Sequence, residues 1–308
     1  MIIKPINQTK LFGHEIFFNE LVKLSETGRL PNKILFSGKK GIGKSTIAYH
    51  FINHILSRDE EFSYDLNNFT INSLNSTYKT MLNGSNPNFI LVDLNSEKKK
   101  IEINQIRELI LNLNKSSFNE KPRFVLIDNL EFLNVNSINA LLKIVEEPND
   151  NVNFILINNN KKILPTLLSR CINFKIYLSN HKCHEVINKL IKNNLTSAIN
   201  KEFLDYYSSP GNIYNLINFA NENRYDLSDL NLKTFLKSII KNKHYKKDGN
   251  INYLIFDLVE LYIRKTNLLS SKINNDYDDF LKRISDTKIF NLDYETFFMN
   301  FEDKILNG

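Results

Sequence analysis

The sequence predicts an α/β fold with a parallel sheet in its first half and a helical second half. Two observations predict it. The apolar, strand-like runs KILFS (33–37), NFILVDL (88–94), RFVLI (123–127) and VNFILI (152–157) alternate with segments of helical periodicity. After FKIYLSN (174–180) the strand signals fade and helical patterns continue. Strands that alternate with helices form βαβ units, whose sheet is mostly parallel and covered on both faces.

The helical segments of the first half repeat apolar residues along one helix face. The three sets are Ile47, Phe51 and Ile55; Ile106, Leu109, Ile110 and Leu113; and Ile138, Leu141, Leu142 and Val145. Beyond the last strand we expect helices at about 181–193, 199–208 and 212–222, and a longer set from about 229. The chain therefore divides into an α/β domain (1–178), a small helical domain (179–224) and a C-terminal helical domain (225–308).

Composition is that of an ordinary globular protein, with 308 residues, 42% hydrophobic and 24% charged. No run approaches the ~20 apolar residues that cross a bilayer, and MIIKPINQTK has no long apolar stretch, so neither a membrane span nor a secretory signal is expected. Two cysteines favour a reducing cytoplasm. The net charge of +6 is compatible with nucleic-acid binding, but lysines spread throughout the chain fit a solvated surface equally well.

The segment GKKGIGKS (38–45) matches the phosphate-loop pattern G-x-x-x-x-G-K-[ST], between a predicted strand and a predicted helix. Its glycines permit positive φ, so backbone N–H groups can surround a phosphate at the start of the helix. Lys44 would neutralise the β and γ phosphates, and the Ser45 hydroxyl would bind Mg²⁺. The alternative is a chance glycine turn before a helix. The candidate nucleotide-binding residues are Gly38, Lys39, Lys40, Gly41, Ile42, Gly43, Lys44, Ser45 and Thr46.

The run VLIDNLEFL (125–133) supplies an acid and lacks a base. Asp128 closes a predicted strand and is expected to hold Mg²⁺ together with Ser45, the alternative being a turn or helix-cap aspartate. Hydrolysis also needs a group that orients and deprotonates water. Asn129 cannot take a proton, and in a helix Glu131 would point to another side. The sequence therefore predicts ATP binding with slow or no hydrolysis.

These segments, with NSINALLKIVEEP (136–148) and LPTLLSRC (164–171), resemble in order and spacing the clamp loader of bacterial DNA polymerase III, a branch of the AAA+ ATPases. LFGHEIFFNELVKLSETGRLPNKILFSG (11–38) is similar to the N-terminal segment of that family. The resemblance covers about residues 8–178. It implies an AAA+ P-loop domain at 1–178, a lid domain at 179–224 and a collar domain for oligomerisation at 225–308.

Within this family the chain looks most like the delta-prime subunit. The motor subunits, gamma or tau, carry Asp-Glu where this chain has Asp128-Asn129, and usually four zinc-binding cysteines where residues 46–122 have none. Their sensor-2 arginine would fall near SSPGNIYNL (208–216), where Asn212 stands in its place. The resemblance thus implies ATP or ADP with Mg²⁺, no zinc, and no efficient hydrolysis by the chain's own site.

Two further positions follow from the resemblance. Asn158 matches the sensor-1 residue, and Arg170 matches the arginine finger that reaches a neighbouring subunit's ATP. Outside this context Arg170 would be an ordinary surface or salt-bridge arginine. The implied partners are the delta and gamma/tau subunits in a hetero-pentamer, the sliding clamp and primed DNA. The implied location is the replisome at the nucleoid, in the cytoplasm.

Other interpretations stay open. A compact gamma-type motor subunit would hydrolyse ATP itself, and a P-loop small-molecule kinase would need an arginine-bearing lid in a chain poor in arginine. His181, Cys183 and His184 in HKCHE could bind a metal, but a surface cluster without further ligands fits better. The run EKKK (97–100) could touch DNA, although a solvated loop is the simpler interpretation.

Overall fold

The computed structural model describes residues 4–94, 98, 100–116, 118–146, 151–159, 163–192, 194–204, 209–246, 249–269, 275–290 and 292–307. The chain groups into two compact units. One contains residues 2–189 with 209–211, and the other contains residues 190–208 with 212–308. We call them the nucleotide unit and the helical unit. The division into three domains at 178 and 224 stays a prediction.

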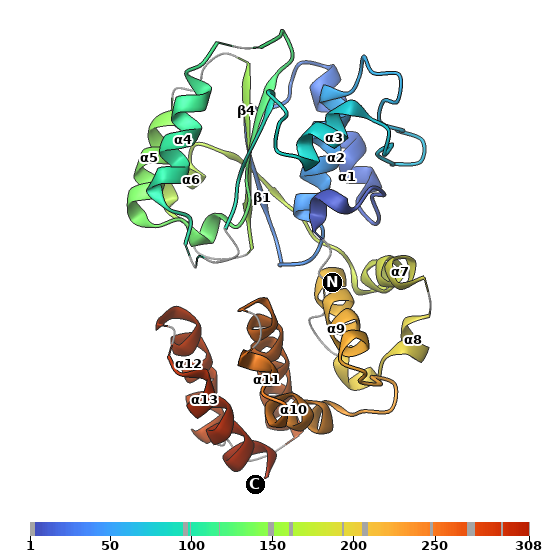
Figure 1. The fold of residues 1–308 in the computed structure, drawn as a ribbon, viewed down its shortest axis with the longest axis vertical. Coiled ribbons are helices and arrows are strands. Elements are labelled where there is room, and N and C mark those ends of the chain that lie inside the picture. The colour runs from blue at the N-terminus through green and yellow to red at the C-terminus, as the bar shows by residue number, and fades with distance from the viewer. Residues whose placement is uncertain are drawn as a thin grey trace. The chain divides into compact units, whose positions relative to one another are not determined.

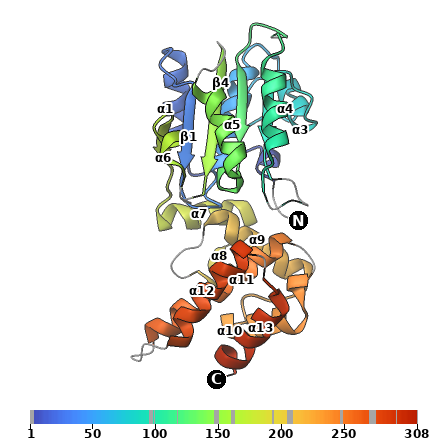
Figure 2. The ribbon, with the colours of Figure 1, turned by 90° about the vertical axis from the view of Figure 1, so that its left-hand side faces the viewer.

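The nucleotide unit is built on a five-stranded sheet (Figures 1 and 2). The strands are β1 (Lys33–Ser37), β2 (Phe89–Val92), β3 (Arg123–Ile127), β4 (Val152–Asn158) and β5 (Ile172–Lys175). All four pairings are parallel, in the order β2-β3-β4-β1-β5. Interior strands of such a sheet are covered on both faces, which explains why β3 is buried along its whole length.

Helices cover both faces of the sheet (Figure 1). On one side lie α1 (Glu15–Glu26), α2 (Lys44–Leu56) and α3 (Ser76–Leu82), and on the other α4 (Ile103–Leu113), α5 (Val135–Glu146) and α6 (Pro165–Leu168). Phe18, Phe36 and Phe51 belong to the first core, and Leu109 and Leu141 to the second. Alternate strand residues supply both cores, because successive side chains point to opposite faces.

Smaller elements complete the nucleotide unit. They are the 3₁₀ turns Pro5–Asn7 and Leu130–Phe132 and most of the helix α7 (Asn180–Ile191). Arg123 at the start of β3 is buried, and its guanidinium donates to the carbonyls of Leu113 and Lys115 at 3.1 Å each and of Asn112 at 2.5 Å. The carbonyls of Asn112 and Leu113 lie in the last turn of α4, where backbone acceptors lack helical partners, and that of Lys115 lies just after it. Arg123 therefore fixes α4 to the start of β3.

The helical unit contains α8 (Leu195–Ala198), most of α9 (Pro210–Glu222), α10 (Leu232–Lys241), α11 (Gly249–Leu269), α12 (Asn275–Phe290) and α13 (Tyr294–Phe301). Short 3₁₀ turns lie at Lys201–Phe203 and His244–Lys246, and a π turn at Glu302–Leu306. Aromatic side chains dominate its core, including Phe235, Phe256 and Phe298, each at most 1% exposed. On its surface Lys243 and Lys246 both form ion pairs with Glu295, at 2.9 and 2.7 Å.

The predicted fold class is confirmed: an α/β fold with a parallel sheet, followed by a helical region. The strands predicted at 33–37 and 123–127 have those bounds, whereas β5 lies at Ile172–Lys175 and not at 174–180. At 199–208 the described residues form only the turn Lys201–Phe203, with residues 205–208 outside the described residues. Within the described ranges, no helix is long and apolar enough to span a membrane.

Candidate nucleotide site and interface arginine

The phosphate loop lies between the end of β1 at Ser37 and the start of α2 at Lys44, at the carboxyl edge of the sheet. Gly41 and Gly43 have φ of +79° and +98°, which explains why glycine is needed there. At Gly38 the reason is space, because a Cβ atom would lie 2.3 Å from the carbonyl oxygen of Ile176. Glycine is therefore required at these three positions of the loop, either by its backbone conformation or by the lack of space for a side chain.

Two segments hold the loop from outside. The His14 imidazole Nε2 lies 2.6 Å from the carbonyl oxygen of Ile42, so Nε2 is the donor and carries the proton. Burial lowers the pKa of His14. The backbone N–H of Gly211 donates to the carbonyl of Gly41 at 2.8 Å, and a Cβ at Gly211 would lie 3.0 Å from backbone atoms of Gly41. Residues 209–211 group with the nucleotide unit, so this contact is internal to it.

The Lys44 ammonium is turned into the loop. Its Nζ donates to the carbonyl oxygens of Gly38 at 2.9 Å and Lys39 at 2.6 Å, and the residue is 3% exposed. Burial lowers the pKa of Lys44 to about 8, while the negative charges of Asp128 and Glu131 act in the opposite direction. The Lys44 ammonium thus lies inside the loop, where a phosphate of the nucleotide would also bind.

Ser45 and Asp128 meet, as the sequence predicts. The Ser45 hydroxyl donates to Oδ2 of Asp128 at 2.6 Å, joining the first turn of α2 to the end of β3. Asp128 is 8% exposed. Burial raises the pKa of Asp128 to about 6, the charge of Asp93 adds to this, and the bond from Ser45 opposes it. The hydroxyl and carboxylate expected to share Mg²⁺ are therefore adjacent.

Asn129 is held by an amide network. Its backbone is left-handed, with φ of +55°. Its Nδ2 donates to Oδ1 of Asp93 at 2.8 Å, and its Oδ1 accepts from Nδ2 of Asn159 at 3.1 Å. The same Asn159 nitrogen donates to Oε1 of Glu131 at 2.8 Å. Asn129 and Glu131 thus converge on Asn159, and the expectation that they point to different sides is wrong. The reason is that Asn129 does not continue a helix but turns the chain into Leu130–Phe132.

Asn159 is a site residue that the sequence analysis missed. The predicted sensor residue Asn158 ends β4 and is 5% exposed, and its carbonyl accepts from the backbone N–H of Gly38 at 3.3 Å. The side chain that reaches Asn129 and Glu131 belongs to the next residue. The available signal was its position directly after an apolar strand, at the edge where the phosphate loop lies.

Arg170 lies on the surface of the same unit, shortly after α6. Its Nη2 forms an ion pair with Oε1 of Glu146 at 2.6 Å, and its Nη1 donates to the Thr166 carbonyl at 2.7 Å. The side chains of Arg170 and Glu146 are 33% and 47% exposed. Arg170 is thus both a salt-bridge arginine and accessible to a neighbouring molecule. Glu146 belongs to the family-specific motif NALLKIVEEP. The two residues that follow it in this motif, Glu147 and Pro148, lie outside the described residues.

The two weaker candidates from the sequence are the HKCHE and EKKK segments. His181 pairs with Glu185 at 3.3 Å, and Cys183 is buried. Among the described residues no group of three or more histidines, cysteines or acids could hold a metal ion. Of EKKK, residues 97 and 99 lie outside the described residues, and Lys98 pairs with Glu102.

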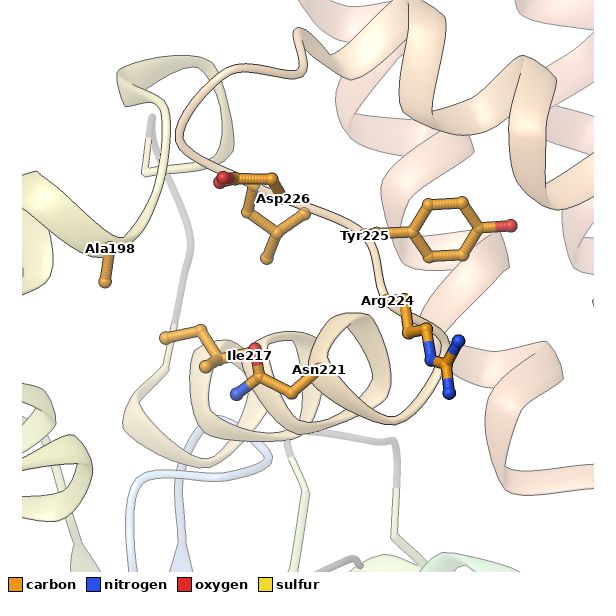
Figure 3. Close-up of a pocket in the computed structure, with 7 residues that line it drawn as sticks. Ala198, Ile217, Asn221, Arg224, Tyr225 and Asp226 are labelled. Atoms are coloured by element: carbon orange, nitrogen blue, oxygen red, sulfur yellow. The ribbon is translucent and has the colours of Figure 1, made fainter.

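A pocket of about 380 Å³ lies in the helical unit (Figure 3). Ile217 and Asn221 project from α9 at its floor, whereas Tyr225 and Arg224 point away from Ala198. The Tyr225 hydroxyl is engaged with His244 Nε2 at 3.0 Å and Asn242 Nδ2 at 2.7 Å. This hydroxyl therefore joins side chains within the helical unit by hydrogen bonds.

The fold and site define a class of protein. A phosphate loop after β1, an acid at the end of β3 and the order β5-β1-β4-β3-β2 define a P-loop protein of the AAA+ type. The sequence profile of the family described as "DNA polymerase III, delta subunit" matches residues 13–179, more than half of the chain. The chain therefore belongs to the clamp-loader branch of the AAA+ family.

Individual relatives carry several subunit names. The DNA polymerase III subunit gamma of Buchnera aphidicola (Schizaphis graminum) is 28% identical over 78% of this chain and 66% of its own length. The subunit gamma/tau of Mycoplasma genitalium is 31% identical over 56% of this chain and 27% of its own length. The subunit delta' of Pseudomonas aeruginosa is 28% identical over 45% and 40%. The chain thus spans less than two thirds of each of these relatives.

Among solved structures, a DNA polymerase III gamma subunit-related protein of Thermotoga maritima aligns with 91% of this chain and 96% of its own. The two are 16% identical, with a TM-score of 0.43.

Proposed function

We propose that the chain is a delta-prime-type subunit of a DNA polymerase III clamp loader. It binds ATP or ADP with Mg²⁺ without efficient hydrolysis, and it gives Arg170 to the nucleotide of an adjacent motor subunit. Its partners are the delta and gamma/tau subunits of a hetero-pentamer, which places the sliding clamp on primed DNA at the replisome in the cytoplasm. Residues 179–224 act as the lid and 225–308 as the collar. Family membership and the relatives' names support the clamp-loader assignment.

The residues of the loop fit the phosphates of a nucleotide. The left-handed glycines Gly41 and Gly43 let backbone N–H groups turn inward, and in the described structure no side chain caps the start of α2. Lys44 would exchange its two carbonyl contacts for phosphate oxygens. Ser45 and Asp128, 2.6 Å apart, offer the hard oxygen ligands that Mg²⁺ prefers, one directly and one through water.

One observation carries the proposal of inefficient hydrolysis: the side chain at position 129 is an amide held between Asp93 and Asn159. An amide cannot accept the proton of an attacking water, and this amide already has acceptor and donor partners. The gamma or tau motor subunits that the chain resembles carry a glutamate at this place, and a carboxylate can take the proton of water. The site therefore supports retention of a nucleotide better than its turnover.

The test has two arms. A fluorescent ATP analogue titrated into the purified chain should bind with Mg²⁺, while phosphate release stays at background. In the assembled loader with clamp and primed DNA, Arg170→Ala should reduce ATP turnover by about 10³-fold or more while the subunits still co-elute. Brisk turnover by the pure chain would exclude the non-motor role, and full activity of the Arg170→Ala complex would exclude the finger.

A gamma-type motor is the second candidate, and a specific contact favours it. The Glu131 carboxylate shares the Asn159 amide with Asn129, and its charge acts on Lys44. In a motor, Glu131 would be the base that replaces the missing glutamate. Turnover by the purified chain that disappears in Glu131→Gln and persists in Glu108→Gln, an exposed glutamate of α4, would establish this candidate.

A further inference from the structure

We propose that Glu146 is the positioning residue for the Arg170 finger: it orients the guanidinium before the neighbouring nucleotide arrives and then releases it to the phosphate. This inference rests on the proposed role of Arg170 in trans. It arises from the two motifs most specific to the family, NALLKIVEEP and LSRC, which the structure joins through one ion pair of 2.6 Å. The proposed function uses the second motif and gives no role to the first.

The contact fixes the orientation of the guanidinium. Glu146 is the last residue of α5 and engages Nη2, while the Thr166 carbonyl engages Nη1 at 2.7 Å and the Ser169 hydroxyl lies 3.4 Å from Nη1. Two different nitrogens are therefore held by groups from two different elements. Because a guanidinium is planar, two such anchors define its plane.

Donors remain for a phosphate. Arginine has five N–H donors, and the contacts to Glu146, Thr166 and Ser169 use at most three of them. An incoming phosphoryl oxygen can thus bind while the side chain is still held. Prior ordering of the side chain removes part of the entropy that its immobilisation would otherwise cost on engagement.

The ion pair is also weak enough to be exchanged. Both side chains are partly exposed, at 33% and 47%, and ion pairs in such contact with water contribute little. A phosphate carries more charge than one carboxylate, and it can form the same bidentate contact with arginine. Glu146 therefore serves as a replaceable counter-ion and not as a permanent lock.

The test uses the full chain, assembled into the loader with the motor subunits of the same organism. Clamp and primed DNA are present. Glu146→Gln keeps the size and the acceptor oxygen but removes the charge, and Glu108→Gln on α4 is the matched control. We expect Glu146→Gln to lower kcat for ATP by about three- to tenfold, with KM and co-elution unchanged. Glu108→Gln should leave kcat unchanged.

A double-mutant cycle separates positioning from a merely structural role. Glu146→Gln should cost nothing further when Arg170 is already alanine, because its effect acts only through the guanidinium. An unchanged or higher kcat in Glu146→Gln, or an equal loss in both backgrounds, would overturn the inference while the finger stands. If Arg170→Ala itself leaves ATP turnover intact, the proposed function fails and the inference fails with it.

Discussion

Replacing Asn129 by glutamate would place a base at this position, and the structure gives the change a defined cost in folding stability. The amide that now donates to Asp93 at 2.8 Å would become a second carboxylate beside the first. A hydrogen bond to a charged acceptor contributes about 1.5–3 kcal/mol. Two unit charges about 4 Å apart repel by about 4 kcal/mol at an effective dielectric constant of 20. Since both side chains are half-buried and can rotate apart, we expect a charge-specific loss of about 1–3 kcal/mol.

The charge-specific loss is the difference between Asn129→Glu and Asn129→Gln, which share shape and the cost of a left-handed φ of +55°. For a unit of this size it corresponds to a difference in Tm of roughly 2–12 °C, measured by thermal unfolding at pH 8. Asp93 raises the pKa of the new carboxyl in the folded state. The penalty is therefore present above that folded pKa and disappears as the pH falls to about 4. Equal Tm values of the two variants at pH 8 would refute this account of the site.

Three other predictions follow from the site and its support. Gly211→Ala should weaken nucleotide binding at least about fivefold, because the added Cβ would lie 3.0 Å from the backbone of Gly41; isothermal titration measures this. Mg²⁺-dependent ATP affinity should fall below pH about 6, as Asp128 takes up a proton, and above pH about 8, as Lys44 loses one. Arg123→Ala should lower the free energy of unfolding in urea by about 2–4 kcal/mol, because three carbonyls at and just after the end of α4 lose their donor.

Each of these predictions has a control or a result that would contradict it. Gly28→Ala also changes a glycine, and its added Cβ meets no atom within 4 Å. Its φ of +66° strains the alanine, so folding stability should fall while nucleotide affinity stays unchanged. Affinity measured without Mg²⁺ should lose its dependence on pH near 6 and keep that near 8. A flat profile with Mg²⁺ across pH 5–7 would contradict the role of Asp128. For Arg123, urea midpoints within error of the unmodified chain would show that the carbonyls find other donors.

The sequence predicts best where one signal decides the structure. The strands at 33–37 and 123–127 have the predicted bounds because each is a short apolar run ended by polar or turn-forming residues. The bounds predicted for β5 are wrong because its side chains are mostly exposed and only β1 pairs with it. Edge strands carry less of the apolar pattern on which sequence analysis depends.

The same contrast holds for the site. The adjacency of Ser45 and Asp128 follows from the loop motif and the parallel order of strands, and it was predicted. The approach of Glu131 to Asn159 depends on a left-handed turn at Asn129, and tertiary contacts select that turn. The bond from His14 to Ile42 joins residues 28 apart in sequence that no local pattern relates. Pairings of this kind become visible only with the fold.

The amide network also has a direction. Asp93 at one end and Glu131 at the other are carboxylates, which accept hydrogen bonds when ionised and cannot donate them. Asn129 must therefore turn its nitrogen toward Asp93 and its oxygen toward Asn159, whose nitrogen then faces both oxygens. Neither amide can flip without placing oxygen against oxygen. The three strand ends of β2, β3 and β4 are thus joined by a chain of fixed polarity, which an Asn→Asp change at either position would interrupt by charge alone.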